Sequence, residues 1–228
     1  MTDSVFAQAL GSDLTRLHPQ MQRRFGLTPD GENACVGRGV MDEVWRGRAV
    51  TVPFLWFGAW RNILVPRVGT QVPFTIENYC YVDSLGRDTT TFVRTFEFPG
   101  SRRSRFDATM VYDRPAGRVL DYLGTHQHLA VDLDLTVDDR GGLVLRSGAQ
   151  RFYEGRLGFS FPMVASGTAE LREHFDDDAG CFRIDLTVSN PLIGPVFGYR
   201  GSFTCEFSTI EPGAVPASVK PLREESRG

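Results

Sequence analysis

The chain has 228 residues, with 25 basic and 28 acidic side chains and a formal net charge of −3. This length fits a single large β-sandwich or barrel. No stretch gathers lysine or arginine into a stripe that could follow phosphates, which argues against nucleic acid as a partner. The most apolar run, residues 52–60, is far shorter than the roughly 20 residues of a membrane-spanning helix, which argues against a transmembrane segment.

Aromatic residues and turn formers are abundant. The sequence contains 17 phenylalanines, six tyrosines and three tryptophans, together with 24 glycines and 13 prolines, a mixture typical of an aromatic-lined β fold. Its four cysteines are widely separated, no CxxC pair occurs, and no secretory leader precedes them. We therefore expect reduced thiols in a cytoplasmic protein.

The first 25 residues predict short helices. Their apolar residues recur at intervals of three and four, which places them on one face of helical segments; they are Phe6, Leu10, Leu14, Leu17 and Met21. Gly11, Ser12 and Asp13 offer a helix stop followed by a new N-cap, and Pro19 disfavours helical geometry at His18. We predict two or three short helices that pack on a sheet.

Residues 52–60 (VPFLWFGAW) are apolar almost all round and predict another short helix. Three interpretations stay open. The segment is a plug in the core, a lid over a cavity in which Trp56 and Trp60 contact a ligand, or an exposed patch that docks another protein or a membrane surface.

Strand patterns fill most of the remaining chain. Residues 34–45 predict a strand with glycines at bulges, and from Val72 onward apolar residues alternate with a period of two. Strands are predicted at residues 72–83, 90–98, 105–112, 117–123, 129–137, 142–147, 151–161, 169–175, 182–189 and 199–207. Short turns join them and no helix-length segment intervenes, so an antiparallel meander follows.

The predicted fold class is mainly β (α+β). An antiparallel meander forms a barrel or half-barrel, with the short N-terminal helices packed at one end, in a single domain spanning residues 1–210. Residues 211–228 are rich in proline, serine and charge and lack periodicity, so we expect a flexible tail.

Four polar residues stand out because large apolar residues flank them on one strand face: Asn78, Arg94, Asp121 and Glu173. Charged side chains are seldom buried without a partner. If these faces line one cavity, Arg94 and a carboxylate could form a buried hydrogen-bonded network, and the guanidinium could also bind a ligand carboxylate or enolate oxygen. Arg94 with Asn78 would then orient the polar end of a ligand that Phe92 and Phe96 contact. The alternative is that Arg94 pairs with Asp121 or Glu173 only to satisfy buried charge.

Two further segments carry candidate residues. Tyr153 and Glu154 could donate or accept protons, although adjacent strand residues point to opposite faces. In the turn-rich segment 189–201, Tyr199 and Arg200 could be aimed at the cavity mouth, or the segment could be a plain hairpin connection.

Metal and cofactor chemistry find little support in the sequence. His126 and His128 would share a face and could form half of a metal site, but with no further ligand spacing we expect a solvated turn and no metal. No nucleophile elbow, phosphate-binding glycine loop or dinucleotide fingerprint occurs, so no cofactor is expected.

The combination of several motifs resembles the bacterial family catalogued as domain of unknown function 4166. The motifs are LTRLHP from Leu14, PFTIENY from Pro73, RTFEFP from Arg94, FYEG from Phe152 and SNPLIGPVFGYRG from Ser189. The likeness covers roughly residues 14–208 and implies no established activity or catalytic residue.

Three functions follow from these expectations. The first is binding of a lipophilic small-molecule metabolite in an aromatic-lined β cavity. The second is a cofactor-independent cyclase or isomerase of a polyketide- or terpenoid-like substrate, with acid/base work by Tyr153, Glu154, Asp121 or Glu173 beside Arg94. The third is a protein-interaction domain, and a homodimer is also compatible with the sequence.

Overall fold

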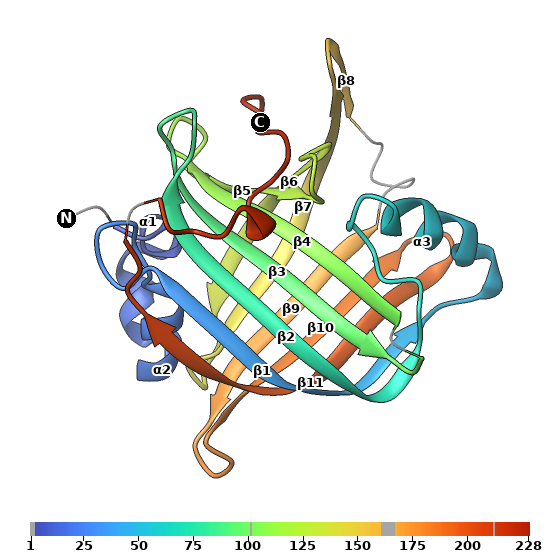
Figure 1. Cartoon of the computed structure of the whole chain (residues 1–228), viewed down its shortest axis with the longest axis horizontal. Helices are drawn as coiled ribbons and strands as arrows, with labels where there is room; N and C mark the ends of the chain where they lie inside the picture. Colours follow the sequence, from blue (N-terminus) through green and yellow to red (C-terminus); the bar gives the residue numbers. More distant parts are fainter. Residues whose placement is uncertain (1–2, 101, 161–166, 212) are drawn as a thin grey trace.

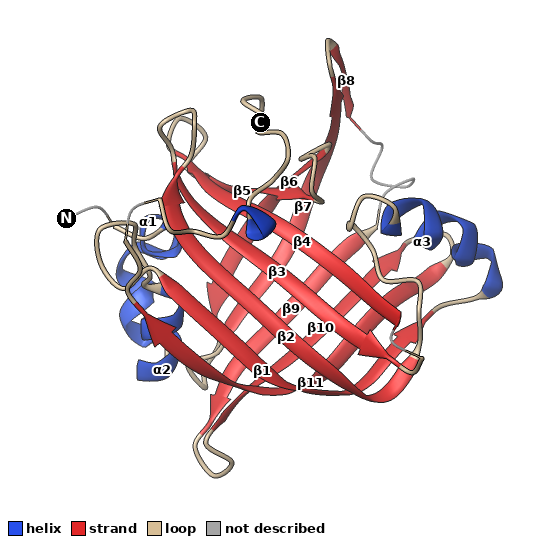
Figure 2. Ribbon diagram, viewed as in Figure 1, coloured by secondary structure: helices blue, strands red, loops and turns tan. Residues whose placement is uncertain are grey.

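The protein forms a closed β-barrel (Figures 1 and 2). A computed structural model describes residues 3–100, 102–160, 167–211 and 213–228. Within these residues ten antiparallel strands close the barrel, and they are β1 (Ala34–Arg46), β2 (Gly69–Val82), β3 (Asp88–Phe98), β4 (Arg102–Asp113), β5 (Arg118–Leu123), β6 (Leu129–Val137), β7 (Leu143–Glu154), β9 (Thr168–Asp176), β10 (Cys181–Asn190) and β11 (Gly194–Ser208). The predicted antiparallel barrel with N-terminal helices is thereby confirmed.

One pairing between distant segments, that of β1 with β11, helps to close the sheet. The circle is completed where β7 pairs with β6, the strand before it, and also with β9, the strand after the β8 hairpin. The other neighbours in the barrel follow one another in sequence, as the short turns predict. Closure pairs most of the wall, although among the described residues the first half of β4, residues 102–107, has a strand neighbour only on the β3 side. Inward-facing side chains in the paired part of the wall are shielded from water.

The region around Ser147 and Gly148 differs from the prediction. The sequence suggests that one strand ends at residue 147 and another starts at 151, but β7 runs unbroken to Glu154. A register shift in β6 lies opposite Gly148, so this glycine accompanies an irregularity in the ladder rather than a turn. The turn comes at Gly155, whose φ is +55°, and leads to β8 (Leu157–Ser160), which extends β7 as a hairpin. The predicted end of this strand, Phe161, lies outside the described residues.

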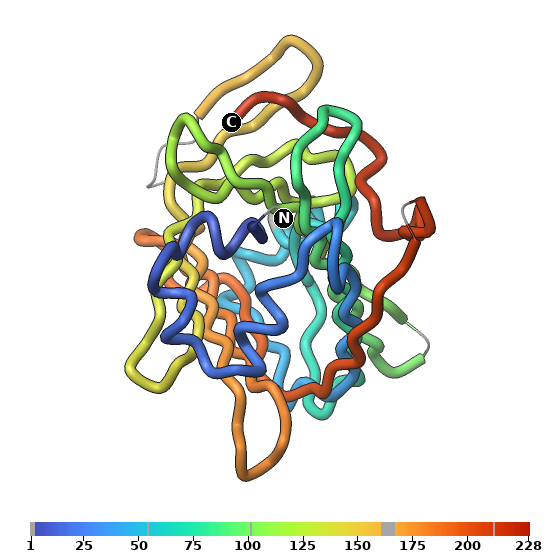
Figure 3. The backbone as a smooth tube through the Cα atoms, turned by 90° about the vertical axis from the view of Figure 1, so that its left-hand side faces the viewer, coloured from blue at the N-terminus to red at the C-terminus, as the bar shows by residue number. Residues whose placement is uncertain are grey.

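Helices cover both ends of the barrel. At one end lie α1 (Val5–Leu10), a 3-10 helix (Gly11–Arg16) and α2 (Pro19–Phe25), which Figure 3 shows facing the viewer. Ser4 caps α1 by accepting a hydrogen bond from the Ala7 amide at 3.0 Å. A 3-10 turn (Ala49–Thr51) and α3 (Val52–Ala59) lie at the opposite end (Figure 1). In the described part of the chain, no helix has the length and apolar character to cross a bilayer.

Aromatic side chains fill the barrel between the N-terminal helices and its middle. Phe6 of α1 packs on Phe92 of β3, with ring centroids 5.9 Å apart. Further along the barrel, Phe74, Phe96 and Tyr199 pack on one another at 5.1 to 6.2 Å. Toward the α3 end, this core is followed by the cavity described below.

A buried ion pair fastens α2 to the barrel. Arg24 points inward and donates from Nε to Glu173 of β9, with both side chains almost fully buried. Its Nη1 donates to Asn78 Oδ1 at 2.8 Å and to Cys35 Sγ at 3.3 Å. A hydrogen bond from the Cys205 thiol, reinforced by the guanidinium, lowers the pKa of Cys35 to about 7. The cluster therefore uses polar contacts to fix a helix to a barrel wall.

The C-terminal tail packs on the outer wall of the barrel. Val215 and Val219 are buried, and the Glu225 amide donates to Gln127 Oε1 at 2.7 Å. A 3-10 turn (Ala217–Val219) lies over the middle strands. The sequence predicts a tail too polar to bury surface, whereas Val215 and Val219 pack in a cluster with residues of β1, β2 and β3, a contact that the periodicity of the tail alone does not reveal. The flexibility of the tail stays a prediction.

Replacing Arg24 should destabilise the fold far more than replacing its neighbour. Arg24→Met leaves Glu173 buried without its partner, which costs ~3–5 kcal/mol of unfolding free energy. Arg23 pairs with Glu32 at the surface, so Arg23→Met should cost less than ~1 kcal/mol. Urea unfolding followed by tryptophan fluorescence compares the two, and equal losses would contradict the anchoring role of Arg24.

Candidate functional site

The half of the barrel toward α3 contains a cavity of about 110 Å³. Its wall is mostly apolar and comes from strands β3 to β7 and β9 to β11. Ile63 and Leu64, which follow α3, line it as well. The remaining wall is formed by Arg94, Phe106, Met110, Asp121, Leu123, Leu129, Val131, Leu133, Leu145, Ser147, Gln150, Gly167, Ala169, Leu171, Leu186, Val188 and Phe197.

Arg94 brings a positive charge into this apolar space. It lies in the middle of β3, directly opposite Phe106 of β4, and its side chain is 4% exposed. Its guanidinium carbon lies 4.9 Å from the Phe106 ring centre and 5.4 Å from that of Phe92. Its Nε and Nη1 have no hydrogen-bond partner among the described residues. The rings hold the guanidinium in place, while its donors are left for another acceptor.

Asp121 brings a carboxyl group to the same cavity. It lies on β5, opposite Met110 of β4, and is 7% exposed. Burial raises the pKa of Asp121 to about 7, although the charge of Arg94 and a hydrogen bond from the Thr109 backbone act in the opposite direction. No ion pair joins it to Arg94 in the described part of the protein, and its Oδ1 has no hydrogen-bond partner there. The carboxyl group therefore changes its protonation state near neutral pH.

Tyr199 contributes a phenol close to Arg94. The tyrosine is fully buried on β11, and burial raises the pKa of its hydroxyl while the charge of Arg94 lowers it. The hydroxyl oxygen has no hydrogen-bond partner within the described ranges. Tyr199 is not among the residues that line the cavity, whereas Arg94 and Asp121 are. Because unpaired buried polar atoms are costly, the latter two mark a place where a polar ligand atom would bind favourably.

The four polar residues singled out from the sequence are all buried, but they form two clusters instead of one. Arg94 and Asp121 line the cavity. Asn78 and Glu173 point inward nearer the N-terminal helices, where both bind Arg24. The alternative in which Glu173 satisfies Arg94 is therefore wrong, because Arg24 reaches Glu173 from α2.

The predicted aromatic contacts lie outside the cavity wall. Phe92 packs on Phe6, and Phe96 packs on Phe74 and Tyr199. Trp56 and Trp60 project from α3 to the surface, with exposures of 49% and 72%. Leu55 of α3 turns inward, with 0% exposure. The helix is thus neither wholly a plug nor wholly exposed.

The two other candidate pairs are Tyr153 with Glu154 and Tyr199 with Arg200. Each pair consists of adjacent strand residues, whose side chains point to opposite sides of the strand. Tyr153 packs in a cluster on the outer wall with Tyr122, and Glu154 is 54% exposed beside His128. Neither lines the cavity. Arg200 lies on the outer face and pairs with Glu43 at 3.1 Å, whereas its neighbour Tyr199 is in the core.

The two histidines of the GTHQH segment stack on each other. The rings of His126 and His128 are 5.4 Å apart and almost parallel. Arg61 Nη1 lies 3.0 Å from Nε2 of His126, and Glu154 lies 2.9 Å from Nδ1 of His128. Among the residues the structure describes, no group of three or more histidine, cysteine or acidic side chains surrounds a common point.

Sequence reasoning missed Arg24 and the cavity wall formed by residues 63 and 64. Arg24 falls three positions after Met21, so it shares the apolar face of the predicted helix, and that spacing could have revealed it. Ile63 and Leu64 follow the exposed part of α3, and only the three-dimensional path of the chain brings them over the cavity.

Comparison with known proteins connects the chain to one family. The family model described as "Domain of unknown function (DUF4166)" matches residues 17–203. The chain belongs to this family. The protein is also similar to the "Uncharacterized protein YndH" of Bacillus subtilis (strain 168), with 33% identity over 187 residues, which cover 82% of this chain and 90% of that relative. No solved structure matches the chain.

The raised pKa of Asp121 predicts a distinct pH dependence of stability. The folded barrel binds this proton more tightly than an unfolded chain, whose carboxyl has a pKa of 3.8, so protonation favours folding. The contribution of Asp121 to the unfolding free energy is therefore full below about pH 4 and falls as the pH rises toward 7. Asp121→Asn should remove this contribution, whereas Asp134→Asn, at an exposed position of β6, should not.

Urea unfolding at several pH values between about 4 and 8 measures the difference between each variant and the wild type. Taking differences removes the opposite contributions of groups such as Glu225, whose pKa is lowered to about 2 by its hydrogen bond from Arg227. If the unfolding free energies of the wild type and Asp121→Asn changed with pH in the same way, the raised pKa of Asp121 would be contradicted.

Proposed function

We propose that this protein binds a small lipophilic molecule inside the barrel and holds its polar end between Arg94 and Asp121. One observation carries the proposal. A buried guanidinium and a buried carboxyl, each with unpaired polar atoms, line an otherwise apolar cavity. A barrel that needed only stability would gain from apolar residues at both positions, since buried charges are costly.

The cavity sets the class of ligand. A volume of about 110 Å³ is close to the ~150 Å³ of an apolar cavity that accepts benzene, so the apolar part is a single ring or a short branched chain. The unpaired Nε and Nη1 of Arg94 are donors and require an acceptor, such as a carboxylate, enolate or carbonyl oxygen. The ligand is therefore a compact apolar molecule with one oxygen-bearing end.

The protonation state of Asp121 determines whether an anionic or a neutral group is favoured at the oxygen-bearing end of the ligand. Below about pH 7 its carboxyl is neutral and can donate a hydrogen bond, so an anionic ligand is favoured beside Arg94. Above this pH the carboxylate itself neutralises Arg94 and repels an anion. Binding of a carboxylate ligand should therefore weaken as the pH rises through 7.

Native mass spectrometry of gently purified protein tests the proposal. We expect a species heavier than the denatured chain by the mass of one small molecule. Arg94→Met should lose this extra mass while keeping its circular dichroism spectrum, and Arg38→Met, at an exposed site on β1, should retain it. Benzoate serves as a defined probe, with affinity at least ~10-fold lower for Arg94→Met. An apo mass together with no benzoate binding by the wild type would contradict the proposal.

A second function is favoured by the pairing of Arg94 with a carboxyl that titrates near neutrality. In a cofactor-independent isomerase, the Asp121 carboxylate would take a proton from the carbon beside a ligand carbonyl while Arg94 donates to the enolate oxygen. The resulting carboxylic acid would return the proton to another carbon, which completes the isomerisation without an oxidant or reductant. Tyr153 and Glu154 have no part in this step because they lie outside the cavity.

Deuterium exchange separates binding from catalysis. Protein carrying its ligand is incubated in D₂O, the ligand is extracted, and its molecular mass is measured by mass spectrometry. An isomerase should incorporate deuterium at carbon, and Asp121→Asn should bind the ligand but stop the exchange. A ligand that leaves the protein without carbon-bound deuterium would contradict the catalytic function and leave the binding function intact.

A further inference from the structure

The α3 end of the barrel presents exposed aromatic side chains to solvent. Phe57 and Trp60 are 71% and 72% exposed, and Trp56 is 49% exposed. Val50 and Val68, which flank α3 in the chain, are also exposed. We call these five residues the α3 patch. A cluster of large apolar side chains on the outside of a closed barrel is unusual without a surface that covers it.

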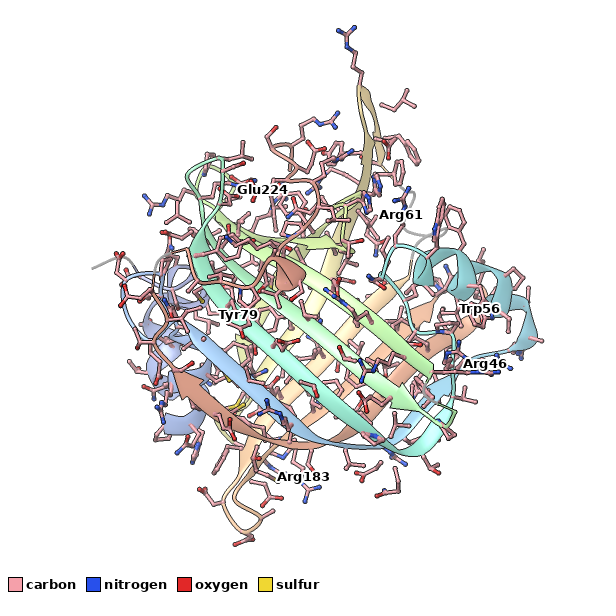
Figure 4. The ribbon with its side chains drawn as sticks, in the orientation of Figure 1. Arg46, Trp56, Arg61, Tyr79, Arg183 and Glu224 are labelled. Carbon is pink, nitrogen blue, oxygen red and sulfur yellow. The ribbon has the colours of Figure 1, made fainter. Side chains whose placement is uncertain are left out.

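Positive charge surrounds this patch. Arg46, Arg48, Arg61 and Arg67 flank α3 in the chain, and no aspartate or glutamate occurs between Glu43 and Glu77. The protein as a whole has a net charge of −3, so this end is distinct from the rest. We call these four residues the arginine collar. Figure 4 shows Arg46, Trp56 and Arg61 along the same end of the barrel.

Two of the collar arginines lie over aromatic rings. The guanidinium carbon of Arg61 lies 4.4 Å from the Trp60 ring centre, and that of Arg67 lies 5.2 Å from that of Trp56. Within the described residues, none of the four collar arginines forms an ion pair, whereas Arg103 and Arg105 nearby do. The positive charge of the collar is therefore available to an anionic surface.

We infer that the α3 patch and the arginine collar bind the surface of an anionic lipid bilayer. Tryptophan and phenylalanine insert among the lipid headgroups, and arginine contacts their phosphates. The charge and composition of this end carry the inference. A second argument rests on the proposed function: Ile63 and Leu64 lie between α3 and the cavity, so a bilayer at this end faces the route by which a lipophilic ligand enters.

Vesicle co-sedimentation tests this inference. We expect the wild type to bind vesicles of phosphatidylcholine with phosphatidylglycerol at least ~10-fold more tightly than vesicles of phosphatidylcholine alone. Binding should also move the tryptophan emission to shorter wavelength. Both vesicle types binding equally, or neither binding, would overturn the inference.

Matched variants locate the surface. Trp56→Ser/Phe57→Ser/Trp60→Ser should lower vesicle affinity at least ~10-fold, and Val40→Ser/Val82→Ser/Leu85→Ser, at exposed apolar positions elsewhere, should not. Arg46→Gln/Arg48→Gln should lower it by about tenfold, while Arg38→Gln/Arg140→Gln leaves it unchanged. Circular dichroism checks that each variant is folded. An equal loss of vesicle affinity in the patch variant and in its control variant would overturn the inference.

Two further outcomes distinguish other occupants and the fate of the proposed function. In one outcome the wild type does not bind vesicles but self-associates, and the triple patch variant is monomeric. The patch is then an interface between copies of this chain, and the inference is overturned. Arg94→Met should keep full vesicle binding, because Arg94 lies inside the barrel. Ligand retention with no vesicle binding would overturn the bilayer inference alone, and vesicle binding with no ligand would overturn the proposed function alone.

Discussion

The pairing of β6 with β7 and of β1 with β11 makes the sheet continuous around the barrel, and everything else in the structure depends on that closure. The paired wall shields inward side chains from water, so a buried charge there is costly unless it finds a partner inside. The short helices at the N-terminus cover one end and supply Arg24, which meets that requirement for Glu173. At the other end, α3 and the segment after it leave a cavity in which Arg94 and Asp121 do not form an ion pair.

The two polar clusters show how similar residues serve different purposes. Around Arg24 the acceptors are supplied by the protein itself, from Glu173, Asn78 and the Cys35 sulfur, and the result is a fixed helix. Around Arg94 the protein supplies aromatic faces but leaves two donors unpaired. Unpaired donors buried in an apolar wall are a cost to folding that a ligand would offset. The second cluster is therefore the one that calls for a functional explanation.

The sequence predicts much of this architecture because closed antiparallel barrels leave clear local signals. Period-two alternation marks the strands, and apolar flanks mark Arg94 and Asp121 as inward-facing. Which buried residues lie close together is not predictable in the same way. Alternation shows whether a residue points into or out of the barrel, but it does not show the position of that residue along the barrel axis. The sequence pattern therefore groups Glu173 with Arg94, although Glu173 pairs with Arg24 of α2. Likewise the aromatic run of α3 does not show which of its faces turns inward, because almost every position in it is apolar.

A crystal structure of the protein purified without an added ligand tests the central claim most directly. The account predicts electron density in the cavity for one compact molecule, with an oxygen atom within hydrogen-bonding distance of Arg94 Nε or Nη1 and the remainder against the apolar wall. A cavity that is filled by the surrounding side chains, with Arg94 and Asp121 joined in a direct ion pair, would contradict it.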